Sequence, residues 1–340
     1  MRQKNLVGCL VMLLAFGMSA RTARAEMDDG QIGKTRALLK GKKVGFAPIS
    51  MGFDLPQVWY QGLKRDADRY GYQLIVRDAN WNVQAGAQAI NQLIGEKVDV
   101  LIIHPQEMLS YAKLVDRAND AGISVVQVNM KSPNNGDAYV GANWTEVFVR
   151  QAEEMSKLCG RDKGHTGKIA LIQGVLTTSG SQIGRRTLGD YFATHKDMEI
   201  VADQAADWDS SKARAVAGTI LKQHRDLCGI IGFWEVQDMG IAAAIKEAGL
   251  QGKIALVTNG GGEQKSNCAN VMNGNFTVDV SYDARGQARD LAATVMMLLQ
   301  NKPKPSASHP IGIYSPVKAV TKDNAANACW SLDAVKRDGP

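Results

Sequence analysis

Val98–Glu107, with the sequence VDVLIIHPQE, is the stretch that decides the fold of this chain. Its short, nearly continuous run of Val, Ile and Leu is typical of a parallel strand that is buried on both faces. Proline cannot continue a central ladder, so we expect the strand to end at Ile103, before Pro105. In open α/β sheets, ligands bind beyond the carboxyl ends of the strands. His104 is therefore expected on the rim of a ligand-binding crevice.

Strands and helices alternate along the whole chain in the same way. The strands expected in the first half are Lys43–Pro48, Tyr72–Val76, Val98–Ile103 and Ser124–Asn129. Those expected in the second half are Lys168–Gln173, Ile200–Ala202, Gly229–Gly232, Ile254–Thr258, Phe276–Val280 and Ile311–Ile313. Helices of ten to fifteen residues separate most of them, for example Met108–Ala121 and Glu263–Asn273. This alternation predicts parallel sheets built from right-handed βαβ units.

Two such sheets in tandem predict an α/β protein with two similar doubly wound, Rossmann-like domains and a cleft between them. The chain is expected to cross between the domains near Gly141–Asn143, near Ser281–Asp283 and in the tail beyond Pro310. The predicted N-terminal lobe comprises residues 42–141 and 283–310. The predicted C-terminal lobe comprises residues 142–281 and 311–337.

The charge balance argues against partners that are recognised by bulk charge. The 340 residues carry a formal net charge of +6, with 45% hydrophobic and 22% charged residues. However, residues 1–25 contain four of the 40 basic residues and none of the 34 acidic ones, so the rest is nearly neutral. We therefore expect neither a nucleic-acid partner nor a membrane-surface role.

Residues 1–25 have the features of a signal peptide for export. Arg2 and Lys4 form a charged start, Leu6–Phe16 an apolar core, and Ala23-Arg24-Ala25 a cleavage site. The apolar core is too short to span a membrane. The mature chain is expected to begin near Glu26 and to be exported.

Export makes the four cysteines after residue 25 candidates for disulfide bonds. Four cysteines allow three connectivities, and the sequence does not select one. We favour a Cys268–Cys329 bond and leave Cys159 and Cys228 either paired or free. Their spacing matches no metal-binding motif.

Motifs of catalysis and cofactor binding are missing from the sequence. It contains no P-loop, no G-x-G-x-x-G after a first strand, and no H-E-x-x-H, C-x-x-C or G-x-S-x-G. Gly260-Gly261-Gly262 is interpreted as a tight turn rather than an anion site. We therefore expect a binding protein that is not an enzyme and that uses no cofactor or metal.

The expected strand ends carry aromatic and hydrogen-bonding side chains. Aromatic faces cover the C–H faces of a sugar or polyol, and amide, carboxylate and guanidinium groups hydrogen-bond its hydroxyls. Arg186, near the start of a helix, can join this set. The candidate ligand-binding residues are Phe53, Asp54, His104, Asn129, Arg186, Trp208, Trp234, Glu235, Asn259 and Asp279.

Several of these residues have simpler explanations. His104 could hydrogen-bond only to backbone, and Arg186 could pair with Asp190, four residues further along its helix. Asp54 could serve only as a helix cap. The remaining tryptophans, Trp59, Trp81, Trp144 and Trp330, are interpreted as packing residues.

Seven phrases carry a resemblance to a known family. In chain order they are ADRYGYQLIVRDAN, VDVLIIHP, AGISVVQVN, IALIQG, RRTLGDYF, ADWDSSKA and IKEAGL. Between Lys43 and Thr321 the chain resembles the periplasmic substrate-binding proteins of the ribose/galactose type, which are receptors for ATP-driven sugar importers. The resemblance implies two similar α/β domains that are joined by a three-strand hinge and close on one ligand.

The resemblance also implies roles for individual residues. His104 matches a strand-end asparagine that contacts the sugar, and Asn129 matches an acidic contact. Arg186 and Trp208 match an arginine and a stacking aromatic residue. Trp234-Glu235 matches an Asn-Asp pair of the family. Asn259 matches an acidic residue that precedes glycine, and the Asp279–Tyr282 segment matches a contact from the third hinge strand. The first loop, Phe53-Asp54-Leu55-Pro56, departs most from the family pattern.

The function that the resemblance implies is that of a solute-binding receptor in the periplasm. It would capture a small sugar-like or polyol ligand as a monomer and deliver it to the membrane permease of an ABC importer. Alternatively, it would present the ligand to a membrane histidine kinase or chemoreceptor. Several of the matched positions carry a different residue from the family's sugar contact. The differences argue against ribose and favour a larger or less polar ligand, such as a polyol, a deoxy sugar, a glycoside or another cyclic compound.

Overall fold

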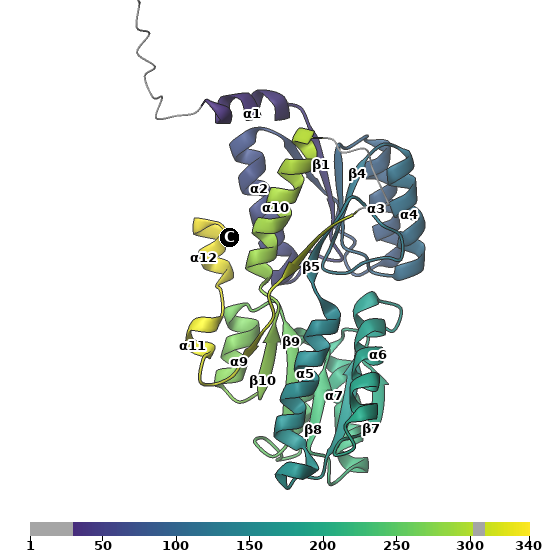
Figure 1. The fold of residues 1–340 in the computed structure, drawn as a ribbon, viewed down its shortest axis with the longest axis vertical. Helices are drawn as coiled ribbons and strands as arrows, with labels where there is room; N and C mark the ends of the chain where they lie inside the picture. Colours follow the sequence, from purple (N-terminus) through teal and green to yellow (C-terminus); the bar gives the residue numbers. More distant parts are fainter. Residues whose placement is uncertain (1–29, 302–309) are drawn as a thin grey trace, which may run out of the picture.

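The structure is a computed structural model that describes residues 30–301 and 310–340. The signal peptide expected at residues 1–25 lies outside the described residues. Two lobes, each built around a six-stranded sheet, are stacked along the long axis of the molecule (Figure 1). This arrangement confirms the expected pair of α/β domains.

The sheet of the N-terminal lobe is parallel throughout and has the strand order β11-β5-β4-β3-β1-β2. Its third strand along the chain, β3, is the apolar run of the opening stretch, and all four of its residues are buried. The strand ends at Ile103, as Pro105 predicts. The strands are β1 (Lys43–Ala47), β2 (Gln73–Val76), β3 (Val100–Ile103), β4 (Ser124–Val128), β5 (Ala138–Ala142) and β11 (Ile311–Ser315).

Helices cover both faces of this sheet (Figure 1). On one face, α2 and α10 pack against each other and share a core with β1, β3 and β4. On the other face, α3 and α4 enclose a separate apolar cluster around Ile90, Leu101 and Val115. The helices of this lobe are α1 (Gln31–Leu39), α2 (Asp54–Tyr70), α3 (Val83–Gly95), α4 (Met108–Asp120) and α10 (Ala284–Asn301).

The sheet of the C-terminal lobe has the strand order β12-β10-β9-β8-β6-β7. Its edge strand β12 runs antiparallel to β10, whereas the other strands are parallel, so the expectation of parallel pairing was wrong for this edge. The strands are β6 (Lys168–Gln173), β7 (Glu199–Ala205), β8 (Gly229–Gly232), β9 (Ala255–Gly260), β10 (Val278–Ser281) and β12 (Lys318–Val320).

The helices of the C-terminal lobe flank this second sheet (Figure 1). The expected helix Glu263–Asn273 is divided into a π-helical turn and one short α-helical turn. The helical segments are α5 (Trp144–Cys159), η1 (Arg161–Lys163), α6 (Ser179–Thr194), α7 (Ser210–Gln223), α8 (Glu235–Glu247), η2 (Gln264–Cys268), α9 (Ala269–Met272) and α11 (Ala325–Ala328). A last helix, α12 (Leu332–Asp338), packs on α2 of the N-terminal lobe.

The crossings between the lobes correct part of the predicted domain boundaries. The first two follow β5 and β10, close to the expected positions. The third lies beyond Pro310, as expected, but β11 pairs with the edge of β5 and the chain leaves this sheet only after Ser315. Assigning all of residues 311–337 to the C-terminal lobe was therefore wrong for residues 311–315. It was also wrong for α12, where the Arg65 side chain donates to the Asp338 carbonyl at 2.5 Å.

Two disulfide bonds lie in or beside the C-terminal lobe. Cys268–Cys329 confirms the pairing that we favoured, and Cys159–Cys228, which the sequence left open, is also bonded. Their Cα atoms are 6.1 and 5.7 Å apart, within the usual range for disulfides. Cys268–Cys329 ties the tail to η2 just before the tail reaches the N-terminal lobe.

None of the helices in residues 30–301 and 310–340 combines the length and the apolar character that crossing a bilayer requires.

Candidate ligand-binding site

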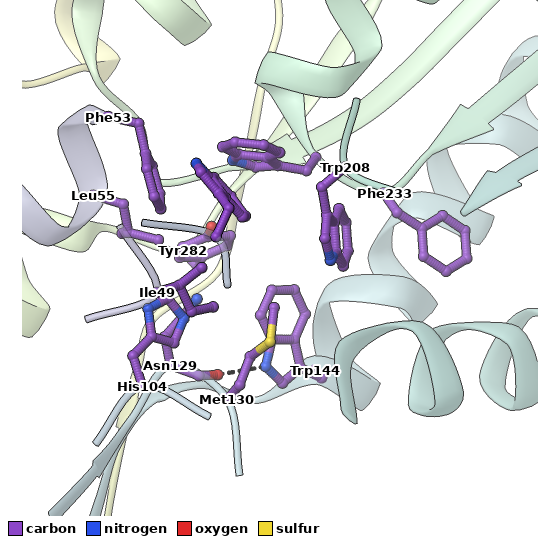
Figure 2. Close-up of a pocket in the computed structure, with 12 residues that line it drawn as sticks. Ile49, Phe53, Leu55, His104, Asn129, Met130, Trp144, Trp208, Phe233 and Tyr282 are labelled. Atoms are coloured by element: carbon purple, nitrogen blue, oxygen red, sulfur yellow. Dashed lines mark hydrogen bonds between the residues drawn. The ribbon is translucent and has the colours of Figure 1, made fainter. Parts of the chain in front are cut away.

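A small cavity of about 30 Å³ lies between the lobes, where the strand ends of both sheets face each other (Figure 2). In each sheet the order of strands reverses at one point, between β1 and β3 in one lobe and between β6 and β8 in the other. Such reversals open a crevice at the carboxyl ends of the strands. The cavity is lined by Ile49, Phe53, Leu55, Trp81, His104, Asn129, Met130, Trp144, Trp208, Phe233, Trp234 and Tyr282.

His104 follows β3 and is only 2% exposed. Its backbone N–H donates to the Ala47 carbonyl at 3.1 Å, and its ring packs edge-on against Trp59 at 5.0 Å between centroids. Neither ring nitrogen has a hydrogen-bond partner among the described residues. Burial lowers the pKa of His104 to about 3, so the imidazole is neutral at physiological pH. The ring can therefore offer one donor and one acceptor to a ligand.

Asn129 follows β4 with a left-handed backbone, φ 59°, which asparagine tolerates better than most residues. Its carbonyl oxygen accepts from the Tyr139 hydroxyl at 2.8 Å and from the Trp144 indole N–H at 2.6 Å (Figure 2). These bonds hold the turn to the hinge strand β5 and the start of α5. The side-chain Oδ1 atom is buried and has no partner in the described part of the chain. Asn129 thus presents a free acceptor at the cavity.

Aromatic rings from both lobes meet across the cleft. Phe53 stacks on Trp81 within the N-terminal lobe, with centroids 5.3 Å apart. Trp234 of the C-terminal lobe packs edge-on against Phe53 at 5.3 Å and lies 5.8 Å from Trp81. Trp208 in turn packs edge-on against Trp234 at 6.2 Å. These rings, together with Trp144, Phe233 and Tyr282, give the cavity an aromatic wall.

Polar contacts also join the lobes around the cavity. The Ser266 hydroxyl donates to Asp54 at 2.7 Å, and the Lys131 N–H donates to the Ser179 hydroxyl at 3.1 Å. The Met108 N–H donates to the Thr177 carbonyl at 3.3 Å. The structure therefore represents a closed arrangement of the two lobes.

The cavity brings together five of the ten candidate residues, namely Phe53, His104, Asn129, Trp208 and Trp234. Arg186 is not part of the lining. It is exposed, because α6 turns Gly184 and Leu188 towards the lobe interior at this level. Asp54 lies at the cleft but points to Ser266.

The other three candidates lie behind the cavity wall. Asn259 donates from its Nδ2 atom to the Gln151 side chain at 3.1 Å. Asp279 accepts from Asn267 at 2.9 Å. Glu235 is buried beside Gly260, where the carboxyl group occupies the space that a Cβ atom would need. Each of the three nevertheless keeps one buried oxygen without a hydrogen-bond partner among the described residues.

These buried carboxyl groups hold protons more strongly than usual. Burial raises the pKa of Asp279 to about 7. Burial raises the pKa of Glu235 well above its usual range, and the negative charges of the nearby Asp54 and Asp279 raise it further. Burial also raises the pKa of Asp238 to about 7, although its carboxylate accepts a hydrogen bond from Thr258. Burial raises the pKa of the Tyr282 hydroxyl well above its usual range, and the nearby Glu235, Asp54 and Asp279 raise it further.

Seven lining residues were not among the candidates. Trp81 and Trp144 were interpreted as packing residues, yet both follow strands, as the strand-end rule requires of site residues. Trp81 lies in the loop after β2, and Trp144 starts α5 directly after β5. Met130 and Tyr282 fell within segments that the family resemblance pointed to. The apolar Ile49, Leu55 and Phe233 carry no signal that separates them from core residues.

Comparisons with known proteins place this architecture. The family model described as "Periplasmic binding protein domain" matches residues 44–303. A D-ribose/D-allose-binding protein of Pseudomonas aeruginosa is 27% identical over 57% of this chain and 61% of its own length. A xylitol-binding protein of Mycolicibacterium smegmatis is 26% identical over 65% of this chain and 62% of its own length. The matched region thus spans about three fifths of these relatives.

Solved structures share the fold. A solute-binding protein of Burkholderia graminis in complex with D-arabinose has a TM-score of 0.75, with 23% identity, over 86% of this chain and 99% of its own. A solute-binding protein of Bacillus halodurans with bound myo-inositol has a TM-score of 0.74, with 20% identity, over 85% and 97%. The family consists of solute-binding proteins rather than enzymes, as the sequence predicted. The chain belongs to the periplasmic binding protein family, in the ribose/galactose type.

Proposed function

We propose that this protein is a periplasmic receptor that captures a small sugar-like or polyol solute between its lobes. It then delivers the solute to the membrane permease of an ABC importer. The observation that carries the proposal is the interlobe cavity, in which His104 and Asn129 keep buried hydrogen-bonding atoms without partners while aromatic rings form the walls. A ligand that supplies these missing partners would recover the free energy that their burial costs.

Closure would couple binding to delivery. Phe53 and Trp81 on one lobe meet Trp234 on the other across the closed cleft. A solute that contacts both lobes binds the closed form better than the open form, so it shifts the hinge equilibrium towards closure. The permease would then recognise the closed form. Relatives that are ribose import binding proteins or ABC transporter solute-binding proteins support import rather than sensing.

A ligand screen tests this proposal. Purified protein would be titrated calorimetrically with a panel of pentoses, hexoses, polyols, inositols and their amino derivatives. We expect one solute to bind with a micromolar dissociation constant and to raise the melting temperature. Absence of binding across the panel, with turnover of any member, would contradict the proposal.

A further inference from the structure

The wall of the cavity is unusually aromatic for a site that holds a polyhydroxylated solute. Seven of its twelve lining residues are aromatic: Phe53, Trp81, Trp144, Trp208, Phe233, Trp234 and Tyr282. Such rings can cover the C–H face of a sugar, but they also bind cations through the negative potential of the ring face. Quaternary and methylated ammonium groups are recognised by aromatic cages of this kind. An aromatic wall is therefore compatible with two classes of ligand, neutral sugars and organic cations.

The charges around the cavity favour the cationic class. Within the described chain, no lysine or arginine lines the wall, and the buried His104 is neutral. Two acids adjoin lining residues along the chain, because Asp54 precedes Leu55 and Glu235 follows Trp234, and a third, Asp279, is bonded to Asn267 behind the wall. A cation in the cavity would meet no positive group of the lining, and each of these acids would attract it on losing its proton.

The hydrogen-bonding capacity of the wall favours a ligand with few hydroxyl groups. A hexose brings several hydroxyl groups, and each one left without a partner in a buried site costs binding free energy. Here the buried atoms without partners at the cavity belong to His104 and Asn129. They suffice for one or two hydroxyls, and the Tyr282 hydroxyl and the indole N–H groups of the wall can add a few more hydrogen bonds. Most of the remaining surface is carbon.

We propose, resting on the function proposed above, that the solute is a small hydroxylated organic cation. Its alkylated ammonium group lies among Phe53, Trp208 and Trp234, and its hydroxyl hydrogen-bonds to His104 and Asn129. Tertiary and quaternary amino alcohols and N-methylated amino sugars belong to this class. The charge of the ligand, more than its ring size, is then what the site selects.

Matched pairs of probes separate charge from shape. Choline and 3,3-dimethyl-1-butanol have the same size and hydroxyl group, but only choline is charged. N-methyl-D-glucosamine and D-glucose form a second pair. Calorimetric titration of the full-length protein with all four should show each cation binding at least about tenfold more tightly than its neutral partner, in line with a cation–π contribution of 1–2 kcal/mol.

The outcomes distinguish this inference from the proposed function. Equal or tighter binding of the neutral member of the pairs overturns the assignment of charge and leaves a sugar-binding receptor standing. Failure of all four probes and of the whole solute panel contradicts both proposals. Tight binding of N-methyl-D-glucosamine with weaker binding of D-glucose supports both, whereas a preference for choline alone supports the cationic ligand and contradicts a sugar-like or polyol solute.

A variant series locates the charge within the cavity. Trp208→Phe should keep the preference for choline, because an aromatic face remains. Trp208→Leu should weaken choline at least about fivefold while changing 3,3-dimethyl-1-butanol by less than about twofold. Tyr314→Leu, an exposed aromatic position outside the cavity, serves as the matched control. Equal weakening of both probes by Trp208→Leu would show that the ring contributes only apolar contact and would overturn its place in the cage.

Discussion

At the scale of single residues, His104 links the fold to the site. Its position after a buried strand and before a proline was readable from ten letters of sequence, and the structure places its ring at the cavity. Burial keeps the ring neutral, and its two nitrogens lack partners among the described residues. A folded protein that buries such atoms gives up stability in order to bind a ligand.

Replacing His104 by phenylalanine should separate these two effects. His104→Phe keeps the edge-on ring contact with Trp59 but removes both nitrogens, so the ligand-free protein should gain about 1 kcal/mol in the free energy of unfolding. The affinity for the solute identified by screening should fall about 10- to 100-fold. Urea denaturation and calorimetry measure the two quantities. His165→Phe, at an exposed position, is the control and should alter neither. A variant that binds as tightly as the parent protein would remove His104 from the site.

The buried acids predict how stability depends on pH. Asp238 and Asp279 have folded pKa values of about 7, above their ordinary value, because burial disfavours the charged form. Groups with raised pKa values contribute stability that is fully present below about pH 4 and is lost as the pH rises through about 7. These two groups should therefore lower the free energy of unfolding by a few kcal/mol between pH 4 and pH 8.

Asp279→Asn should flatten this dependence, since the amide cannot ionise. Thermal melting of ligand-free protein from pH 4 to pH 8 would measure it. The exposed Asp226, whose pKa is lowered by its hydrogen bond from Lys168, provides the control variant Asp226→Asn, which should keep the downward trend of the parent. A melting temperature that rises from pH 5 to pH 8 in the parent protein would show that these carboxyls are not buried as described.

At the scale of elements, the sequence correctly predicted the features that depend on residues close together along the chain. Long apolar runs fixed β3, β4 and β6, and the strand-end rule brought Phe53, His104 and Trp208 to the cavity. Gly260 ends β9 where a Cβ atom would collide with Asn267 and Glu235, so this glycine serves close packing, which the expectation of a tight turn did not include. Such features follow from neighbours along the chain.

Features that depend on spatial neighbours were missed. Asn259 is the last residue but one of β9 and Asp279 the second residue of the adjacent β10, and their side chains bond to Gln151 and Asn267 behind the cavity wall, because alternate residues of a strand face opposite sides. Arg186 was misplaced because the face of α6 that meets the lobe is set by packing. The tail was misassigned because β11 is only five residues long and takes its place from the edge of β5.

The tail also supports a prediction at this scale. The Cys268–Cys329 bond closes a segment of 61 residues and precedes Trp330, whose indole N–H donates to the Gly261 carbonyl at 2.8 Å. Removing the bond with Cys268→Ala and Cys329→Ala should lower the free energy of unfolding by about 2–4 kcal/mol. Urea denaturation checks this value. Reduction of the double variant then breaks only Cys159–Cys228, so the contributions of the two bonds to the free energy of unfolding can be measured separately. An unchanged midpoint in the double variant would show that the tail is held by packing instead.

At the scale of the whole molecule, the two lobes form a clamp whose closed form is stabilised from several sides. Chain segments cross between the lobes after β5, β10 and β11, and α12 returns to pack on α2. The tail, held at η2 by its disulfide, therefore connects the lobes a fourth time. Opening must preserve these connections, so we expect a bending motion about the strand ends rather than a separation of the lobes.

Contacts across the cleft should set the balance between the open and closed forms. Phe53→Ala removes the ring that touches both Trp81 and Trp234. It should favour the open form in the absence of ligand and weaken solute binding about tenfold or more, because part of the binding energy is then spent on closure. Tryptophan fluorescence titration would follow both effects. Binding that is unchanged by Phe53→Ala would mean that these rings do not contribute to closure.

Small-angle X-ray scattering with and without bound solute measures closure of the cleft. The full-length protein would be measured alone and in the presence of the solute that binds most tightly in the screen, at a concentration that just saturates it. The radius of gyration should be smaller with the solute, and the decrease should be smaller for His104→Phe at the same concentration, because this variant binds more weakly. A radius of gyration that is identical with and without a solute shown by calorimetry to be bound would contradict ligand-driven closure of the cleft.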